Sequence, residues 1–334
     1  MLIGGMFMKL SKEIGIDLGT ANILIYVKGE GIVVNEPSVV TINTETNRPI
    51  AVGEEARDML GKTPGKFQAI RPLKDGVIAD FQITEILITH FINKLNLKGV
   101  FSRPTILICC PSNITSIEKS AIQDVALRCG AKRVYIEEEP KVAAIGLDIS
   151  KPSGNMVIDI GGGTTDVAVL SLGDIVTSTS LKVAGDKMDA ELIKYVKDKY
   201  KLLIGDRTAE EIKVNIGTAY KDGEEVTSQI SGRDLVTGLP HTIQLNAKET
   251  QEALEECCST ILRATKQVLE QTPPELSADI VNKGIFLTGG GALLHNLDKY
   301  LEEGLGVPVF VADNALDCVA EGCGIMLENT QYLK

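Results

Sequence analysis

The same pattern occurs twice in the chain, at positions 13–33 and 155–176. "EIGIDLGTANILIYVKGEGIV" and "NMVIDIGGGTTDVAVLSLGDIV" each read as an apolar strand, an aspartate, a glycine turn with hydroxyl residues and a further strand. Asp17 and Asp159 hold the same place in the two copies. A repeat at so long a spacing indicates a duplicated domain, because solenoid repeats recur every 20 to 50 residues or so.

Both glycine turns are followed by alternating apolar residues rather than by a helix. A dinucleotide-binding glycine loop leads from a strand into a helix that holds the pyrophosphate. Here each turn is expected to join two strands of a hairpin. Two facing hairpins could grip a polyphosphate through backbone N–H groups and hydroxyls. Asp17 and Asp159 could then hold Mg²⁺, directly or through its waters.

A third glycine cluster, "GIFLTGGGALLHNLDKYLEEGLGVPVFVADN", reads as strand, glycines, helix and strand. It resembles a dinucleotide site with Asp313 as the ribose acid, but Leu294 stands where the third glycine is needed. The pattern instead predicts close backbone approach at 289–291 and a helix N-terminus that faces a ligand.

Composition narrows the classes of function. A chain of 334 residues with 44% hydrophobic and 24% charged residues is expected to fold as about two globular domains. A net charge of −11 argues against a nucleic-acid binder and against electrostatic attraction to anionic lipid, so any membrane contact is expected to be hydrophobic. Seven cysteines without a CxxC motif indicate reduced thiols in a cytosolic protein rather than a zinc site.

Helix and strand signals alternate through the rest of the chain. "SIEKSAIQDVALRCGA" has helical spacing, with an apolar face assigned to Ile117, Ile122, Val125, Ala126 and Cys129. "DAELIKYVKDKY" and "KETQEALEECCSTILRATKQVLEQT" are predicted to be amphipathic helices. The two halves are expected to join near 139–146.

The order of "IDLGT", "EEEPKVAAIG", "VIDIGGGTTD" and "IFLTGGGALL" resembles the actin, Hsp70 and sugar-kinase superfamily. "NEPSVV", "AVGEEAR", "RPLKDGVIADF", "KLLIGDRTAEEIK" and "GRDLVTGLP" resemble the bacterial actin MreB family across nearly the whole chain. "LICCPSNITS" and "EEEPKVAAIG" look most like its Mbl-type branch, which also carries Asp at the position of Asp166, where many family members have Glu.

The resemblance implies an α/β, actin-like (ribonuclease H-like) fold, with duplicated domains and four subdomains around a nucleotide cleft. Domain I is expected at 9–141, with a small insert at about 35–67. Domain II is expected at 142–334, with an insert at about 186–250 and a C-terminal helix that could pack back on domain I.

The resemblance also implies roles for individual residues. Asp17 and Asp159 match the Mg²⁺-organising acids, and Glu139 and Thr164 match the residues that position the attacking water. The residues expected to bind ATP or ADP are Gly19, Thr20, Ala21, Asn22, Gly161, Gly162, Gly163, Thr164, Thr165, Gly185, Asp186, Glu210, Lys213, Gly289, Gly290, Gly291 and Ala292.

The family implies a weak ATPase that assembles into paired protofilaments at the inner face of the cell membrane. Its implied partners are further copies of itself and membrane-bound cell-shape and wall-synthesis proteins, with no nucleic acid. Val100 and Phe101 match a loop that dips into lipid, and residues 1–7 offer a second contact unless Met8 is the true start. The location expected is cytoplasmic and peripheral to the membrane.

Two other functions remain open for this fold. A small-metabolite kinase would use an aspartate as a base toward its substrate, whereas Glu139 is suited to positioning a water molecule. A chaperone would need a peptide-binding domain after "CGIMLENTQYLK", where the given sequence ends at Lys334. The filament-forming ATPase is the reading that the motifs favour.

Overall fold

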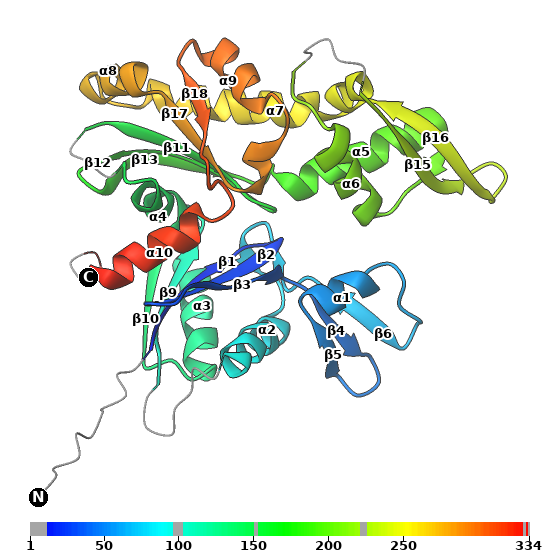
Figure 1. The fold of residues 1–334 in the computed structure, drawn as a ribbon, viewed down its shortest axis with the longest axis horizontal. Helices are drawn as coiled ribbons and strands as arrows, with labels where there is room; N and C mark the ends of the chain where they lie inside the picture. The colour runs from blue at the N-terminus through cyan, green and yellow to red at the C-terminus, as the bar shows by residue number, and fades with distance from the viewer. Residues whose placement is uncertain (1–11, 96–102, 150–152, 221–225, 330–331, 333–334) are drawn as a thin grey trace, which may run out of the picture.

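Two five-stranded sheets form the centre of the protein (Figure 1). The structure, a computed structural model, describes residues 12–95, 103–149, 153–220, 226–329 and 332. One sheet lies in the lower half of the view and the other in the upper half. Helices cover the outer face of each sheet, and two helices fill the space between the sheets.

The first sheet has the strand order β10-β9-β1-β2-β3. Its strands are β1 (Glu13–Leu18), β2 (Asn22–Val27), β3 (Gly31–Pro37), β9 (Thr105–Cys110) and β10 (Arg133–Glu138). β1, β2 and β3 form an antiparallel meander, while β9 and β10 run parallel to β1. Asp17 is the second-last residue of β1.

The second sheet repeats this arrangement with the order β13-β12-β11-β17-β18. Its strands are β11 (Asn155–Ile160), β12 (Thr165–Ser171), β13 (Asp174–Leu181), β17 (Ile285–Thr288) and β18 (Val309–Val311). Again three antiparallel strands are followed by two parallel ones. Asp159 is the second-last residue of β11, so the two aspartates of the sequence repeat occupy equivalent places in the two sheets.

The helices pack in three layers around the sheets. α2 and α3 lie below the first sheet, α4 and α10 lie between the sheets, and α7, α8 and α9 lie above the second (Figure 1). These helices are α2 (Phe81–Lys94), α3 (Ser116–Arg128), α4 (Glu139–Gly146), α7 (Ala247–Glu270), α8 (Pro274–Lys283), α9 (Leu297–Leu305) and α10 (Cys318–Glu328).

Each half carries a smaller addition on the right of the view. In the first half this is a sheet of β4 (Val40–Asn43), β5 (Arg48–Val52) and β6 (Phe67–Ile70) with α1 (Glu54–Met59), followed by the hairpin of β7 (Leu73–Lys74) and β8 (Val77–Ile78). In the second half it consists of α5 (Gly185–Tyr200), β14 (Leu202–Leu203), α6 (Asp206–Ile216), β15 (Thr227–Asp234) and β16 (Pro240–Asn246).

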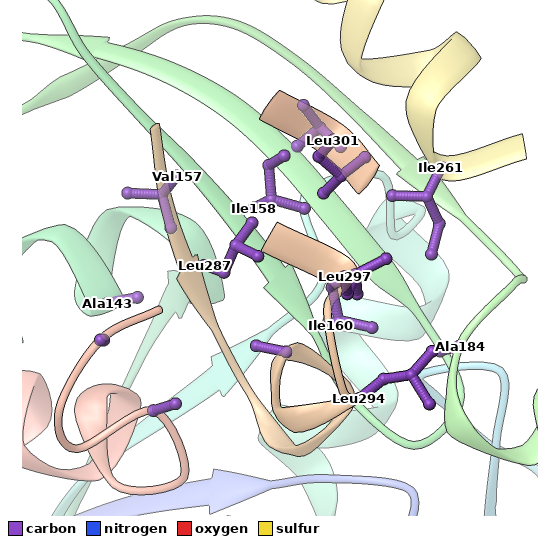
Figure 2. Close-up of a cluster of buried hydrophobic side chains, with 14 of the residues drawn as sticks. Ala143, Val157, Ile158, Ile160, Ala184, Ile261, Leu287, Leu294, Leu297 and Leu301 are labelled. Atoms are coloured by element: carbon purple, nitrogen blue, oxygen red, sulfur yellow. The ribbon is translucent and has the colours of Figure 1, made fainter. Parts of the chain in front are cut away.

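The core of the second half is aliphatic (Figure 2). Val157, Ile158 and Ile160 of β11 are fully buried together with Leu287 of β17 and Leu297 of α9. Burying a side chain of this size stabilises a fold by about 1.5–3 kcal/mol relative to leaving it in water. β11, the strand that ends at Asp159 and the second glycine turn, therefore packs on a continuous apolar core.

α10 belongs late in the chain but packs on β1, β2 and β9 of the first sheet. Cys323 of α10 lies against Gly15, where a side chain on β1 would collide with it. Its Sγ is 3.1 Å from the Sγ of Cys109 on β9, and both are free, buried thiols. A helix from the last part of the chain thus completes the core of the first half.

α3 differs from its predicted apolar face at one position. Ile122 and Val125 are buried, but Ile117 is 79% exposed. Ile117 lies in the first turn, and a spacing of five residues at about 100° each places it well away from the face of Ile122.

In the described part of the chain, no helix has the length and apolar character needed to cross a membrane.

Candidate functional site

The two glycine turns face each other at the centre of the molecule. The first turn connects the antiparallel strands β1 and β2, and the second connects β11 and β12, as the alternating sequence pattern predicts. A side chain at Gly162 would come within 2.7 Å of Ala21 Cβ, and one at Gly163 within 2.5 Å of Thr20 Oγ1. Glycine is therefore required here because the two loops touch.

A cavity of about 430 Å³ opens between these loops. Its size is within the range of small-molecule sites. Both halves of the chain contribute to its wall. The predicted residues on the wall are Asp17, Gly19, Thr20, Ala21, Asn22, Glu139, Asp159, Gly161, Gly162, Gly163, Thr164, Gly185, Asp186, Glu210, Lys213, Gly289, Gly290 and Gly291.

Asp17 and Asp159 lie at the base of the loops as an interacting pair of carboxyl groups. Burial, followed by the charge of Asp159, raises the pKa of Asp17 to about 7. Burial and the neighbouring Asp166 raise the pKa of Asp159 to about 6, against a hydrogen bond that Thr288 Oγ1 donates to its Oδ1 at 2.9 Å. A bound cation would favour the charged form of both acids, so the pair fits a Mg²⁺ site.

The described residues contain no cluster of three or more His, Cys, Asp or Glu side chains suited to a metal. Two carboxylates alone suit Mg²⁺ when water and phosphate oxygens complete its shell. The donor set therefore fits a metal that arrives with a phosphate ligand better than a permanently held structural ion.

Glu139 and Thr164 approach the cavity from different elements. Glu139 is the first residue of α4, and its position after β10 points it into the cavity at 8% exposure. Burial, then the charges of Asp166, Asp17 and Asp159, raise the pKa of Glu139 well above its usual value. Thr164 stands at the end of the second loop and is also buried.

Asp166 lies next to the cavity wall, beside Asp159, and connects the two halves of the chain. It lies on β12 opposite Asp159 and is fully buried. Its Oδ1 accepts a hydrogen bond of 2.7 Å from the backbone N–H of Ser112, which follows β9 in the other half. This bond joins the two halves beneath the cavity.

α5 is attached to the second loop through its first residues. The N–H of Gly185 donates to Gly161 O at 3.1 Å, and the N–H of Asp186 donates to Gly162 O at 2.8 Å. Lys213 of α6 donates through Nζ to Gly185 O at 3.1 Å and to Asp189 Oδ2 at 2.9 Å. Gly185 and Asp186 are thus bonded directly to the loop at 161–163, and Lys213 is connected to it through Gly185.

The third glycine cluster approaches β11 closely. Gly289 has a φ of +79°, and a side chain there would collide with Ile160 O. The segment Gly290–Leu293 is a single 3₁₀ turn, and the regular helix α9 begins only at Leu297. The first residues of the 3₁₀ turn therefore line the cavity, and the regular helix begins later in the chain than the pattern predicts.

Some predicted residues lie elsewhere. Thr165 and Ala292 are buried behind the cavity wall, and Thr165 Oγ1 donates to Val183 O at 2.7 Å. Val100 and Phe101, like residues 1–7, are outside the described residues. The lipid-contact prediction for them remains a prediction.

The structure also adds residues to the wall that the sequence patterns do not indicate. Arg71, Gly76 and Asp189 are polar or backbone contributors, and Val214, Leu293, Leu316 and Val319 add apolar surface. The N–H of Gly76 donates to Thr20 Oγ1 at 3.2 Å. The segment "RPLKDG" carries two of these residues, but no spacing rule links it to a glycine loop.

Comparison with known proteins identifies the family of the chain. A family model described as "MreB/Mbl protein" matches residues 11–334. The chain belongs to the MreB/Mbl family. It is 61% identical over 325 residues to "Cell shape-determining protein Mbl" of Bacillus subtilis (strain 168), covering 97% of this chain and 98% of the relative. The Mbl-type assignment is therefore confirmed.

Two further members support the family assignment and the fold. "Cell shape-determining protein MreB" of Escherichia coli (strain K12) is 50% identical over 332 residues, covering 97% of this chain and 94% of the relative. The structure of MreB 5 of Spiroplasma citri bound to AMPPNP superposes with a TM-score of 0.92 at 43% identity, covering 96% of this chain and 97% of that one. The predicted actin-like fold is confirmed for this member of the MreB/Mbl family.

Proposed function

We propose that this chain is an ATP-binding and ATP-hydrolysing bacterial actin that forms filaments at the inner face of the cell membrane and directs wall synthesis and rod shape. One observation carries the proposal: two glycine loops, one from each sheet, face each other across a cavity with Asp17 and Asp159 at its base. The AMPPNP-bound relative and the "cell shape-determining" names of the curated relatives support it.

The two glycine loops would hold the phosphates of ATP, and the part of the cavity wall farther from these loops would hold the nucleoside. Backbone N–H groups at 19–22 and 161–164 suit the β- and γ-phosphates. Lys213 and Glu210, one turn apart on α6, suit the adenosine, with Leu293 and Leu316 supplying apolar surface. Asp17 and Asp159 would hold Mg²⁺, which when bound neutralises charge on the phosphates.

Glu139 and Thr164 are proposed to position the attacking water. An ionised Glu139 can accept a hydrogen bond from the water and orient it in line with the phosphorus atom. The Thr164 hydroxyl offers a second hydrogen bond from the other half of the chain. Because the two side chains come from different halves, closing the halves would bring them together, which would link filament assembly to hydrolysis.

The first test is negative-stain electron microscopy with Mg-ATP, with and without anionic vesicles. The proposal predicts paired filaments that align on the lipid. A Glu139→Ala variant should keep ATP binding while phosphate release falls toward background. Particles that stay monomeric with every nucleotide and lipid would overturn the filament proposal, and metabolites that accelerate ATP turnover would then favour the kinase.

A further inference from the structure

The edge of the first sheet where β1, β9 and β10 begin is basic, although the whole chain carries a net charge of −11. Lys12 precedes β1, Arg103 precedes β9, and Lys132 and Arg133 stand at the start of β10. Because these three strands are parallel, their first residues meet at the same edge. We call Lys12, Arg103, Lys132 and Arg133 the basic edge.

Backbone hydrogen bonds fix these residues side by side. The N–H of Thr105 donates to Lys12 O at 3.0 Å, and the N–H of Lys132 donates to Pro104 O at 2.8 Å. Thr105 is the register partner of Glu13 on one side and of Arg133 on the other. Neighbouring strands lie about 4.8 Å apart, so the three strand starts span roughly 10 Å.

Among the described residues, most of this charge has no acidic partner. Arg103, Lys132 and Arg133 are exposed, and within the described ranges none of them has a carboxylate oxygen within 4.0 Å. Arg103 donates through Nε to Gly130 O at 3.2 Å, which holds its side chain against the turn after α3. Lys12 pairs with Glu30 at 2.7 Å.

The surrounding sequence indicates what the basic edge meets. Positions 1–11 and 96–102 join the described chain at Lys12 and Arg103, hence at this same edge. In sequence, "MLIGGMFMKLS" and "NLKGVFS" each combine apolar residues with one lysine and contain no acid. Basic side chains beside apolar sequence suit an anionic bilayer, which offers charge at its surface and hydrocarbon beneath. A nucleic acid or an acidic peptide would use the charge alone.

We propose that the basic edge binds anionic lipid headgroups. This inference rests on the proposed membrane function and adds the class of lipid and the residues that recognise it. It also replaces the expectation, drawn from the net charge of −11, that contact with a membrane must be purely hydrophobic. A chain with a negative net charge can still carry a locally positive surface. Salt screens the charges of distant acids over about 10 Å at 0.1 M, so those acids do not cancel the local positive charge.

The test compares two triple variants with the same change in net charge. Arg103→Gln/Lys132→Gln/Arg133→Gln neutralises the exposed part of the basic edge. Lys248→Gln/Lys266→Gln/Lys299→Gln neutralises three exposed lysines on α7 and α9, on the far side of the second sheet. Thermal melting and ATP binding of both variants should match the wild type, which shows that each is folded.

Binding is measured by co-sedimentation with vesicles of phosphatidylcholine alone or mixed with phosphatidylglycerol. The wild type should prefer the anionic vesicles, and this preference should weaken as salt is raised. The basic-edge variant should lose at least tenfold in partitioning, since each basic residue near an anionic surface contributes roughly fivefold. The control variant should bind as the wild type does.

The outcomes separate the two proposals. If the basic-edge variant binds anionic vesicles as well as the wild type, the basic edge is not the lipid site, while membrane association stands. If the wild type binds neither kind of vesicle, both this inference and the membrane part of the proposed function fail. If an oligonucleotide competes with the vesicles and binds more tightly than they do, the edge recognises nucleic acid and the inference is overturned.

Discussion

Arg71 and Asp186 join the two halves of the chain across the cavity, with Nη1 of the arginine 2.9 Å from Oδ1 of the aspartate. Arg71 follows β6 in the first half and Asp186 is the second residue of α5 in the second half. Both line the cavity, so a ligand bound there lies beside this ion pair. Burial raises the pKa of Asp186, while the Arg71 and Lys213 charges oppose that rise.

We predict that Arg71→Ala speeds the release of bound nucleotide. The pair is about one-third exposed, so its loss is worth up to about 1 kcal/mol, or roughly fivefold in the dissociation rate. Stopped-flow displacement of a fluorescent ATP analogue measures that rate. As a control, Arg207→Ala removes a more exposed pair between the halves, with Asp58 at 3.4 Å, that does not line the cavity. An equal effect of both variants would contradict a local role for Arg71.

Glu139→Gln should abolish hydrolysis without loss of binding. The change keeps the shape of the side chain but removes the charge that orients the water, so kcat should fall by about 10²–10⁴-fold. ATP affinity, measured by titration, should stay within about threefold because a positioning group acts mainly in the transition state. The matched control is Glu138→Gln, which alters the neighbouring, partly exposed glutamate and should leave kcat nearly unchanged.

The pH dependence of phosphate release tests the role of Glu139 independently. Burial and three neighbouring acids raise the pKa of Glu139, so its ionised form becomes available only as the pH rises. The wild-type rate of phosphate release should therefore increase with pH, with a midpoint above the 4.5 of an ordinary glutamate. A rate that does not change between pH 5 and 8 or so would contradict the proposed role of an ionised Glu139.

Without nucleotide and metal, the folded protein should be more stable towards unfolding at mildly acidic pH than at neutral pH. Asp17 and Asp159 have folded pKa values of about 7 and about 6, above the ordinary 3.8, so the folded state binds more protons than the unfolded state. The stability that this gives is present below about pH 4 and is lost as the pH rises through 6 to 7. Thermal melting at pH 5.5 and 7.5 checks this.

Asp17→Asn isolates the cause of that pH dependence. Removing one of two interacting carboxylate charges that are partly or fully shielded from water should raise the melting temperature of the nucleotide-free protein by a few degrees at pH 7.5, on the order of 1–3 kcal/mol. The same change should weaken Mg-ATP binding. A variant that melts below the wild type at this pH would show that burial of the Asp17 charge is not costly.

Gly163→Ala tests the contact between the two loops. The added methyl group would lie 2.5 Å from Thr20 Oγ1 and 2.9 Å from the backbone nitrogen of Asp75, so the halves must separate. The rate of hydrolysis should fall by about 10²-fold, because a misplacement of about 1 Å of the reacting groups costs about that much in rate, and ATP should bind more weakly. Gly65→Ala is the control, since nothing lies within 4 Å of its added methyl group.

The sequence repeat predicted the central architecture because strand, acid and glycine turn are local features. The hairpin connection of both loops follows from neighbouring residues, which alternate like a strand directly after each glycine turn. Arg71 was not predicted, because its place on the wall depends on how β7 and β8 fold back toward Thr20. The exposure of Ile117 differs from the prediction because its five-residue spacing from Ile122 turns it away from the buried face, and the predicted apolar face did not take that angle into account. The basic edge was hidden by the net charge of the whole chain.

The packing of α10 on β1 has a consequence for the order of folding. Cys323 covers Gly15 and meets Cys109, so the first sheet lacks part of its core until the last helix has been synthesised. Contacts so distant in sequence are slow to form, since a long loop must close before they give any stability. During translation the N-terminal half therefore emerges from the ribosome unfinished, with apolar surface exposed for most of the time that the chain takes to be made.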